Sequence, residues 1–341
     1  MRPHPHRDTL LGFLSTQHET SEPERALPVD PQRQQDPAVL ILVDAAADLP
    51  RGVAADPALR VLPLALRLRG RKLRASEAAR RSARQRFDAS TLRQARLEWP
   101  DAGELAWRVH PNLALNGDVL IVLGNALGDA GVALHRMLAE RDAEIRELRA
   151  SRGLPEALQT VRIDTGGAFA VPALHASALL RAKARGADAD ALVRLAQGLA
   201  ASTRHWLLPR APRQFAATLS GIDDPRLRAW TEACTRAPWW SGYPLLEGDA
   251  DGLRCASRAR GWDRALGKAC DAVGQALRPG AQLLLSVDGS VAEFVALPAV
   301  AALRARAQSL GVRMQATHLS VASRIRAGAG TASLALLDQP A

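Results

Sequence analysis

The stretch "LILVDAAADLPRG", residues 40–52, decides the fold that we expect for this chain. Its apolar residues lead to Asp44 and indicate a strand buried inside a sheet. Asp48-Leu49-Pro50 is typical of a helix start, with Asp48 as the predicted N-cap. Three alanines stand between the two aspartates, where an active-site loop more usually carries glycines or hydroxyls. The stretch therefore combines a carboxylate at the tip of a buried strand with a turn lined by methyl groups.

In the first half of the chain, short apolar runs alternate with longer helical periods. Strands are expected at 39–43, 60–66, 118–124 and 160–164. A helix is expected at 130–150, where apolar residues recur at helical spacing. Strands of this kind, separated by helices, predict a mostly parallel sheet with helices on both faces.

The pattern changes after a long helix that is expected at about 169–202. The segment 243–259 holds Gly248-Asp249 and Asp251-Gly252 between two strand-like arms, which predicts a hairpin. The remaining predicted elements are strands at 205–210, 281–287, 313–320 and 331–337 and crossover helices at 262–277 and 291–310. This half is therefore expected to form a mixed α/β sheet.

The sequence thus predicts an α/β protein of two domains, preceded by a tail. The tail covers residues 1–36 and mixes Pro, His, Gln and Glu without sustained periodicity, a composition typical of disorder. The N-terminal α/β domain is expected at 37–165, and the C-terminal mixed α/β domain at 166–341.

The charge of the chain is strongly positive, at +10 with a pI near 10.8. Such a charge raises nucleic acid as a partner, but the basic residues are scattered and only 4% of the residues are aromatic. No apolar run reaches the roughly 20 residues that a membrane-spanning helix needs. We therefore expect neither nucleic-acid binding nor a membrane span.

Cysteines and the N-terminus indicate a cytoplasmic protein. Cys234, Cys255 and Cys270 are odd in number, far apart and without a CxxC pair, which argues against a disulfide framework and a structural zinc site. The first residues lack the apolar stretch and cleavage site of a signal peptide. A reducing compartment, the cytoplasm, is the expected location.

Motifs of catalysis and cofactor binding are missing from the sequence. It has no GxxxxGK[ST] loop, HExxH pair or GxSxG turn, and "GAGTAS" at 328–333 lacks the third glycine of a dinucleotide fingerprint. The sequence predicts no catalytic residue, no metal ligand and no cofactor. A transferase of small hydroxylated substrates stays open by analogy with related α/β folds, and Asp44 is the base that it would use.

Several stretches, taken in order, resemble the DegV family of bacterial fatty-acid-binding proteins. "LVDAAADLP" is similar to its V-T-D-S-T-A-D-L-P signature, and "RVLPLALRLRGRKL" to its second strand. "EWPDAGEL" resembles a Thr-Ser-Gln-Pro-Ser-Pro-Gly-Glu-Phe stretch, and "VRIDT" a Val-Ile-Asp-Ser strand. "YPLLEGDADGLRCASRARGWDRAL" resembles a Lys-Pro-Ile-Leu hairpin, and "RAGAGTASLAL" the closing His-Thr-Gly-Pro-Gly-Ala-Leu-Gly. The ordered set covers some 300 residues and identifies the chain as a diverged member of this family.

This resemblance implies a particular function. It implies a long-chain fatty acid held in a cleft between two α/β domains, and a protein that is not itself an enzyme. It also implies a partner kinase, which phosphorylates the acyl carboxylate that the protein presents.

The residues that would hold the carboxylate depart from the family pattern. The family's histidine before the glycine turn falls on Arg326, and its Ser-Ser pair on Gly124 and Asn125. The threonine and serine of Thr-Ser-Gln-Pro fall on Leu97 and Glu98, so several hydroxyls are lost. The resemblance therefore predicts a remodelled ligand site, with backbone N–H groups around Gly328 and Gly330 as a small anion nest.

Three interpretations of this remodelling stay open. In the first, Arg326 binds the fatty-acid carboxylate, because arginine offers a forked pair of donors. In the second, Glu98 repels a fatty acid or pairs with Arg326, and the protein is a scaffold or regulator that binds another small anionic ligand or none. In the third, Arg326 is a solvated surface residue.

Overall fold

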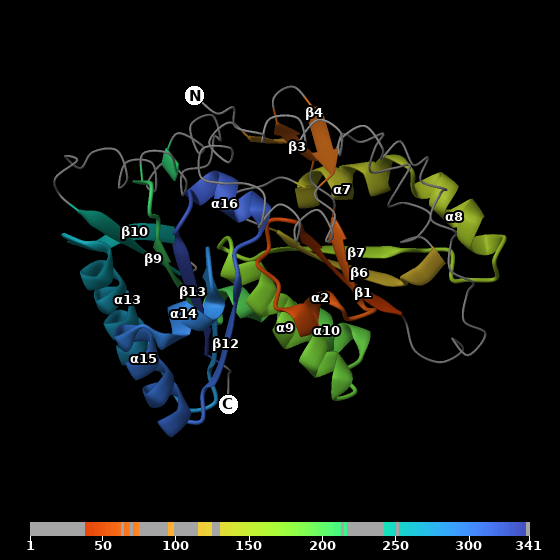
Figure 1. Cartoon of the computed structure of the whole chain (residues 1–341). Coiled ribbons are helices and arrows are strands. Elements are labelled where there is room, and N and C mark those ends of the chain that lie inside the picture. The colour runs from red at the N-terminus through yellow and green to blue at the C-terminus, as the bar shows by residue number, and fades with distance from the viewer. Residues whose placement is uncertain are drawn as a thin grey trace, which may run out of the picture.

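The computed structural model describes residues 38–62, 65–68, 71–74, 95–98, 115–124, 130–212, 215–216, 242–249 and 252–338. Within these ranges the strands form a four-stranded, a six-stranded and a three-stranded sheet (Figure 1). The predicted tail, residues 1–36, lies outside the described residues.

The four-stranded sheet contains the opening stretch and is entirely parallel. Its order is β2-β1-β6-β7, and each neighbouring pair runs in the same direction. The strands are β1 (Val39–Asp44), β2 (Leu59–Leu62), β6 (Val119–Gly124) and β7 (Gln159–Asp164). The predicted parallel sheet is confirmed.

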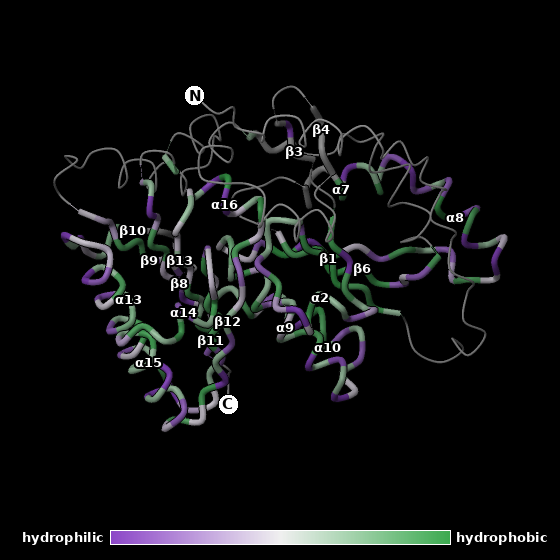
Figure 2. The backbone as a smooth tube through the Cα atoms, in the orientation of Figure 1, coloured by the Kyte–Doolittle hydropathy of each residue, from purple (hydrophilic) through white to green (hydrophobic). Residues whose placement is uncertain are grey.

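Helices cover both faces of this sheet, because alternate residues of its strands are apolar on both sides. Leu40 and Leu42 pack with one set of helices, and Ile41 and Val43 with the other. The first set is α7 (Ala130–Glu140) and α8 (Asp142–Ala150), and the second is α9 (Ala170–Ala184) and α10 (Ala189–Leu199). Figure 2 shows the resulting pattern, with hydrophobic strands β1 and β6 inside and hydrophilic residues along α8.

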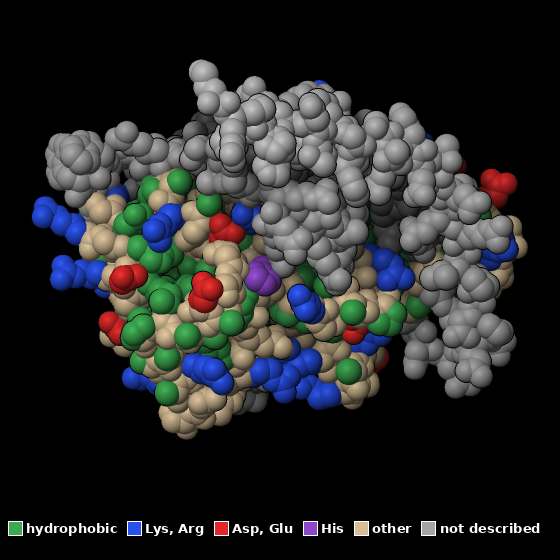
Figure 3. All heavy atoms as spheres, in the orientation of Figure 1, with side chains coloured by type: hydrophobic (Ala, Val, Ile, Leu, Met, Phe, Trp, Pro, Cys, Tyr) green, Lys and Arg blue, Asp and Glu red, His purple; other side chains and the backbone are tan. Residues whose placement is uncertain are grey.

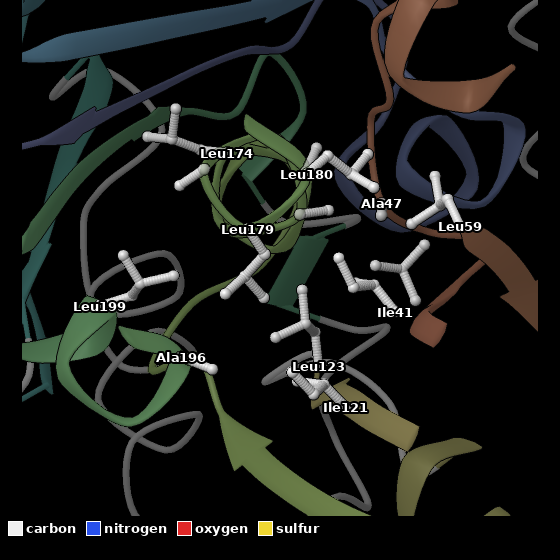
Figure 4. Close-up of a cluster of buried hydrophobic side chains, with 14 of the residues drawn as sticks. Ile41, Ala47, Leu59, Ile121, Leu123, Leu174, Leu179, Leu180, Ala196 and Leu199 are labelled. Atoms are coloured by element: carbon white, nitrogen blue, oxygen red, sulfur yellow. The ribbon is translucent and has the colours of Figure 1, made fainter. Parts of the chain in front are cut away.

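Helix α9 also covers the second large sheet. Its core cluster joins Ile41 and Ile121 of the parallel sheet to Leu284 and Ala335 of the six-stranded sheet. Figure 4 shows Leu174, Leu179 and Leu180 of α9 among the side chains of this cluster. Nearly every residue of α9 is buried as a result, which is expected of a helix that lies between two sheets.

The six-stranded sheet has the order β10-β9-β8-β13-β11-β12. Only the β11–β12 pair is parallel, so the sheet is mixed as predicted. The strands are β8 (Thr203–Leu208), β9 (Tyr243–Asp249), β10 (Gly252–Ala259), β11 (Gln282–Val287), β12 (Arg313–His318) and β13 (Ala332–Leu337). β13 comes last in the chain but lies between β8 and β11.

The predicted hairpin is confirmed, since β9 and β10 pair antiparallel with one register shift between Cys255 and Ser257. The other face of this sheet is covered by helices that follow its strands. They are α13 (Trp262–Ala276), α14 (Val291–Ala296) and α15 (Pro298–Ser309), whose apolar residues form a second core with the sheet.

Some predicted elements are divided in the structure. The long helix at 169–202 is broken into α9 and α10, because Gly186 adopts φ +88° and Asp188 caps a new helix through the N–H of Ala191. A short 3-10 helix, Ala200–Ser202, follows α10. The helix at 130–150 is interrupted at Arg141, and that at 291–310 begins again at Pro298, a favoured first helical residue.

The strand predicted at 60–66 is also divided, between two sheets. β2 ends at Leu62, and β3 (Ala65–Leu68) pairs antiparallel with β4 (Arg71–Arg74) and β5 (Arg96–Glu98). This small sheet was not predicted.

The two large sheets correspond to the two predicted domains in outline. Strands of the parallel sheet lie within 39–164 and those of the mixed sheet within 203–337. The boundary at residues 165 and 166 stays a prediction, because α9 packs on both sheets. Among the described helices, none combines the length and the apolar character needed to cross a membrane.

Candidate functional site

The turn after β1 is closed by the side chain of Asp44. This carboxylate is buried and accepts the N–H of Ala46 at 2.8 Å, while the Asp44 carbonyl accepts the N–H of Ala47 at 3.1 Å. A carboxylate that binds its own turn in this way is a common device of Asp-containing loops. Asp44 at the tip of the strand therefore has a structural task in shaping the loop.

The alanines of the turn form a packing surface for another helix. Ala45 and Ala46 are buried and cluster with Ala322 of α16 (Val321–Ala327). Methyl groups on both sides let the loop and the helix approach closely, as small residues do at helix interfaces. The turn is thus lined with methyl groups because α16, from the far end of the chain, lies against it.

Asp48 holds this contact in place. It was predicted to cap the helix at 51, and that prediction is wrong: α2 (Arg51–Ala54) begins after Pro50 without any side-chain cap. The Asp48 carboxylate turns instead to the C-terminal half, where it accepts the Ser286 hydroxyl at 2.7 Å, the Ser320 N–H at 2.7 Å and the Ser323 hydroxyl at 2.8 Å. Only 1% of the Asp48 surface is exposed, so these donors stabilise the buried charge in place of water.

We call Asp48, Ser286, Ser320 and Ser323 the Asp48 cluster. Within it, the Ser320 hydroxyl accepts the Ser323 N–H at 3.0 Å and so caps the N-terminus of α16. A carboxylate at this end of a helix is further stabilised by the helix dipole. The neighbouring Leu49 carbonyl accepts the Thr317 hydroxyl at 3.2 Å, so the whole loop is attached to the C-terminal half.

Arg326, the predicted ligand residue, lies in the last turn of α16. Only 7% of its surface is exposed, so the interpretation of Arg326 as a solvated residue is wrong. Arg324, two residues earlier, is equally buried and forms an ion pair with Asp288 at 2.6 Å between Nε and Oδ1. Two buried guanidinium groups therefore enter the molecule from one short helix that the Asp48 cluster fixes.

The glycines after α16 form a turn rather than an open anion nest. Gly328 and Gly330 have φ angles of +85° and +79°, which favour glycine. The N–H of Gly328 donates to the Arg324 carbonyl at 3.0 Å, and that of Gly330 to Asp288 at 2.8 Å. Both N–H groups that were predicted to bind an anion thus have acceptors within the protein.

Gly124 ends β6, next to β1 in the parallel sheet. A Cβ atom here would lie 3.1 Å from the Ile163 carbonyl oxygen, so the strand packing favours glycine. The Gly124 carbonyl accepts the hydroxyl of Thr165 at 2.7 Å. This buried hydroxyl at the strand tips was not predicted.

The other predicted site residues are described only in part. Leu97 and Glu98 belong to β5, and α16 packs against this strand, so the helix that carries Arg326 meets the strand that carries Glu98. The side chains of Leu97 and Glu98, and the whole of Asn125, lie outside the described residues.

The residues that sequence reasoning missed are chiefly hydroxyls of the C-terminal half. Ser320 and Ser323 stand three apart before an apolar-basic run, which is an N-cap pattern that could have been recognised. Ser286 carries no such signal, because it lies inside an ordinary apolar strand. Among the described residues, no group of three His, Cys, Asp or Glu side chains could hold a metal ion.

Comparison with known proteins identifies the fold. No protein-family model matches the chain, and no curated protein does either. Among solved structures, the chain is similar to DegV from Bacillus subtilis, described as a fatty acid binding protein, with 12% identity over 89% of this chain and 100% of that one and a TM-score of 0.65.

Two further solved structures are similar to a comparable degree. The DegV family protein of Thermus thermophilus, described by its fatty acid binding, has 18% identity over 88% of this chain and 99% of that one, with a TM-score of 0.61. The stearic acid-binding protein of Eubacterium ventriosum has 14% identity over 88% and 98%, with a TM-score of 0.66. The chain has the two-domain fold of DegV proteins, and the resemblance in its sequence is confirmed for the fold.

Proposed function

We propose that this chain is a diverged DegV protein that binds a long-chain fatty acid between its two domains in the cytoplasm and does not itself catalyse a reaction. The observation that carries the proposal is the burial of Arg326 on a helix that the loop after β1 fixes. Similarity of fold to proteins described as fatty-acid-binding supports it. We further propose that the bound acid is presented to a partner kinase.

In this proposal Arg326 binds the carboxylate through its two terminal nitrogens. Gly328 supports it as the C-cap residue of α16, which ends one residue after Arg326, so that Arg326 lies in the last turn of the helix. Leu97, Glu98, Gly124 and Asn125 contribute the remaining wall of the head-group site, in place of the hydroxyls that the family carries.

The loss of those hydroxyls is compatible with acyl binding because the tail dominates the affinity. Burying about fifteen methylene groups contributes roughly 12 kcal/mol before the costs of binding. One hydrogen bond to a charged head group contributes about 1.5–3 kcal/mol. A changed head-group site should therefore adjust affinity and selectivity rather than abolish binding.

A second candidate function follows from the contact between α16 and β5. Because this contact brings the strand of Glu98 to the helix of Arg326, the two side chains are candidates for an ion pair that neutralises the site. The protein would then be a scaffold or regulator that binds another small anionic ligand or none.

We expect Arg326→Ala to weaken the binding of stearic acid about ten- to hundredfold, because a charge-assisted hydrogen bond of about 1.5–3 kcal/mol is lost. Glu98→Gln should strengthen binding, because a like charge beside the ligand carboxylate is removed. Displacement of a fluorescent fatty-acid analogue from the delipidated protein measures both effects. Arg306→Ala, an exposed arginine of α15, is the control and should leave affinity unchanged.

Mass spectrometry of organic extracts from the natively purified protein distinguishes the two candidates. Co-purified fatty acid that Arg326→Ala depletes supports the acyl-binding function. If extracts hold no lipid and stearic acid does not bind to the wild type or to Glu98→Gln, the acyl-binding proposal is wrong and the scaffold function remains. Thermal unfolding of each variant separates a lost contact from a lost fold.

A further inference from the structure

A groove lies on the outer side of the mixed sheet, away from the proposed acyl site. It has a volume of about 400 Å³ and is formed by α14, α15 and β12. The lining side chains relevant here are Val295, Arg304, Val312, Arg313, Met314 and Ala316. The groove thus combines four apolar side chains with two arginines and two glutamines.

The strand that borders the groove is at the edge of its sheet. β12 is the last strand in the order and pairs with β11. The Arg313 N–H donates to Ala281 at 3.1 Å and the Leu319 N–H to Val287 at 2.9 Å, both on the inner side. Because N–H and C=O groups alternate in direction along a strand, Met314 and Ala316 turn theirs outward. No strand of the described chain pairs with this outer edge.

Two arginines lie at this edge. Arg304 and Arg313 line the groove, whereas no Asp or Glu is among its described lining residues. Behind β12, the pKa of Arg181 is lowered to about 10 by burial and then by the nearby charges of Arg313 and Arg185. In Figure 3, Lys and Arg side chains are prominent along the lower edge of the molecule. Figure 1, in the same orientation, shows that one end of α15 and one end of β12 lie at this edge.

We propose that the groove binds an extended acidic segment of a partner protein, which adds to the outer edge of β12 as a further strand. The outward groups of Met314 and Ala316 would form the main-chain hydrogen bonds of this pairing. Apolar side chains of the segment would enter between Val295 and Met314, and its acidic side chains would meet Arg304 and Arg313.

The charges favour this occupant over the others. A second copy of the chain would bring a net charge of +10 against +10, with arginines on both sides of the contact. Nucleic acid stacks its bases on aromatic rings, and none is among the described lining residues. The proposal does not depend on acyl binding, because neither Arg326 nor the Asp48 cluster takes part in it.

The charge requirement is tested with a fluorescent peptide that alternates Glu and Val over seven residues. Anisotropy with the full chain should show saturable binding, and a matched Lys/Val peptide should not bind. The double substitution Arg304→Glu and Arg313→Glu should weaken binding at least about tenfold. Arg306→Glu is the control, because its side chain lies on another side of α15, where a Cβ at Gly274 of α13 would be 3.5 Å from it.

The strand requirement is tested separately from charge. Met314→Pro removes an outward N–H but no bond of the β11–β12 ladder, and it should weaken peptide binding at least about tenfold, whereas Met314→Leu should not. The same Glu/Val peptide with N-methyl groups at alternate residues examines the pairing from the ligand side, without any change in the protein. One of the two alternating methylation registers should lose binding.

Three results would overturn the proposal. The first is that the Glu/Val peptide shows no saturable binding up to about 1 mM. The second is that peptides of both methylation registers bind equally well. The third is that the double substitution Arg304→Glu and Arg313→Glu leaves peptide binding intact. Self-association in sedimentation that Met314→Pro abolishes would assign the edge to a second copy instead. Preferential binding of a single-stranded oligonucleotide that competes with the peptide would assign it to nucleic acid.

Discussion

Asp48→Ala is expected to lower the free energy of unfolding by roughly 3–5 kcal/mol, because a buried carboxylate with three donors is removed. The donors left behind, Ser286, Ser320 and Ser323, lie 238 to 275 residues away in sequence. The cost combines the lost acceptor of the Ser286 hydroxyl, an unsatisfied N–H of Ser320 at the start of α16 and a small cavity, whereas the Ser323 hydroxyl keeps the Ala46 carbonyl as an acceptor at 2.9 Å. Urea denaturation followed by circular dichroism measures it.

Two variants make this test specific. Asp48→Asn keeps the shape of the side chain but places an amide N–H₂ group among the donors that faced the carboxylate. We therefore expect the free energy of unfolding to fall by an intermediate amount, about 2 kcal/mol. Asp56→Ala is the matched control: among the described residues its carboxylate accepts a local hydrogen bond from the N–H of Ala58 at 2.8 Å, and its loss should cost about 1 kcal/mol. Equal effects of Asp48→Ala and Asp56→Ala would contradict the role that we assign to the Asp48 cluster.

Stability is expected to fall steeply between pH 6.5 and 4.5, because two histidines are buried without charge. Burial, and then the charge of His205, lowers the pKa of His175 to about 3. Burial likewise lowers the pKa of His205 to about 4, although Asp249 and Glu247 act in the opposite direction. The unfolded chain binds protons on both residues below about pH 6.5. In the folded chain, His205 gains its proton only near pH 4 and His175 only near pH 3.

The sign follows from this difference in bound protons. Where the unfolded state binds more protons, stability rises with pH, so the stabilisation is complete above pH 6.5 and is lost as the pH falls. Each histidine should contribute about 1 kcal/mol per pH unit within this window. Urea titrations at pH 7.0, 6.0 and 5.5 measure the slope, because these values lie above the range in which most carboxylates titrate.

The surroundings of His175 explain why it stays neutral. The Thr203 hydroxyl donates its proton to the Leu199 carbonyl at 2.7 Å, so it accepts from His175 Nε2 at 2.8 Å. A second proton would go to Nδ1, which is buried and has no hydrogen-bond partner among the described residues. His175→Gln keeps a donor toward Thr203 and cannot be protonated, so it should remove about half of the pH slope.

A wild-type stability that stays level between pH 6.5 and 5.5 would show that one or both histidines gain protons without unfolding.

The sequence predicts the layers of this protein well because they depend on local patterns. Apolar runs such as residues 39–43 and 118–124 become the strands of the parallel sheet, and two glycine-aspartate pairs mark the hairpin at 243–259. Helix breaks at Arg141 and Gly186 are harder to predict, because one residue decides them within an otherwise helical period.

The site is less predictable because its contacts are distant in sequence. The sequence indicated Arg326 as a candidate through a family motif, and the structure adds that its side chain is buried. In an arginine-rich chain, the sequence alone does not distinguish a buried arginine from an exposed one. Asp48 has the local appearance of an N-cap, but its partners come from the other end of the chain. No local pattern encodes that choice, because only the fold brings Ser320 and Ser323 to the carboxylate.

The place of β13 determines how the mixed sheet is assembled during synthesis on the ribosome. The strands made earlier form two separate parts, β10-β9-β8 and β11-β12, which only β13 joins. Until β13 emerges, β8 and β11 both expose unpaired edges that attract other nascent chains. We therefore expect the unfinished chain to depend on chaperones that shield such edges, and the sheet to close in a single late step.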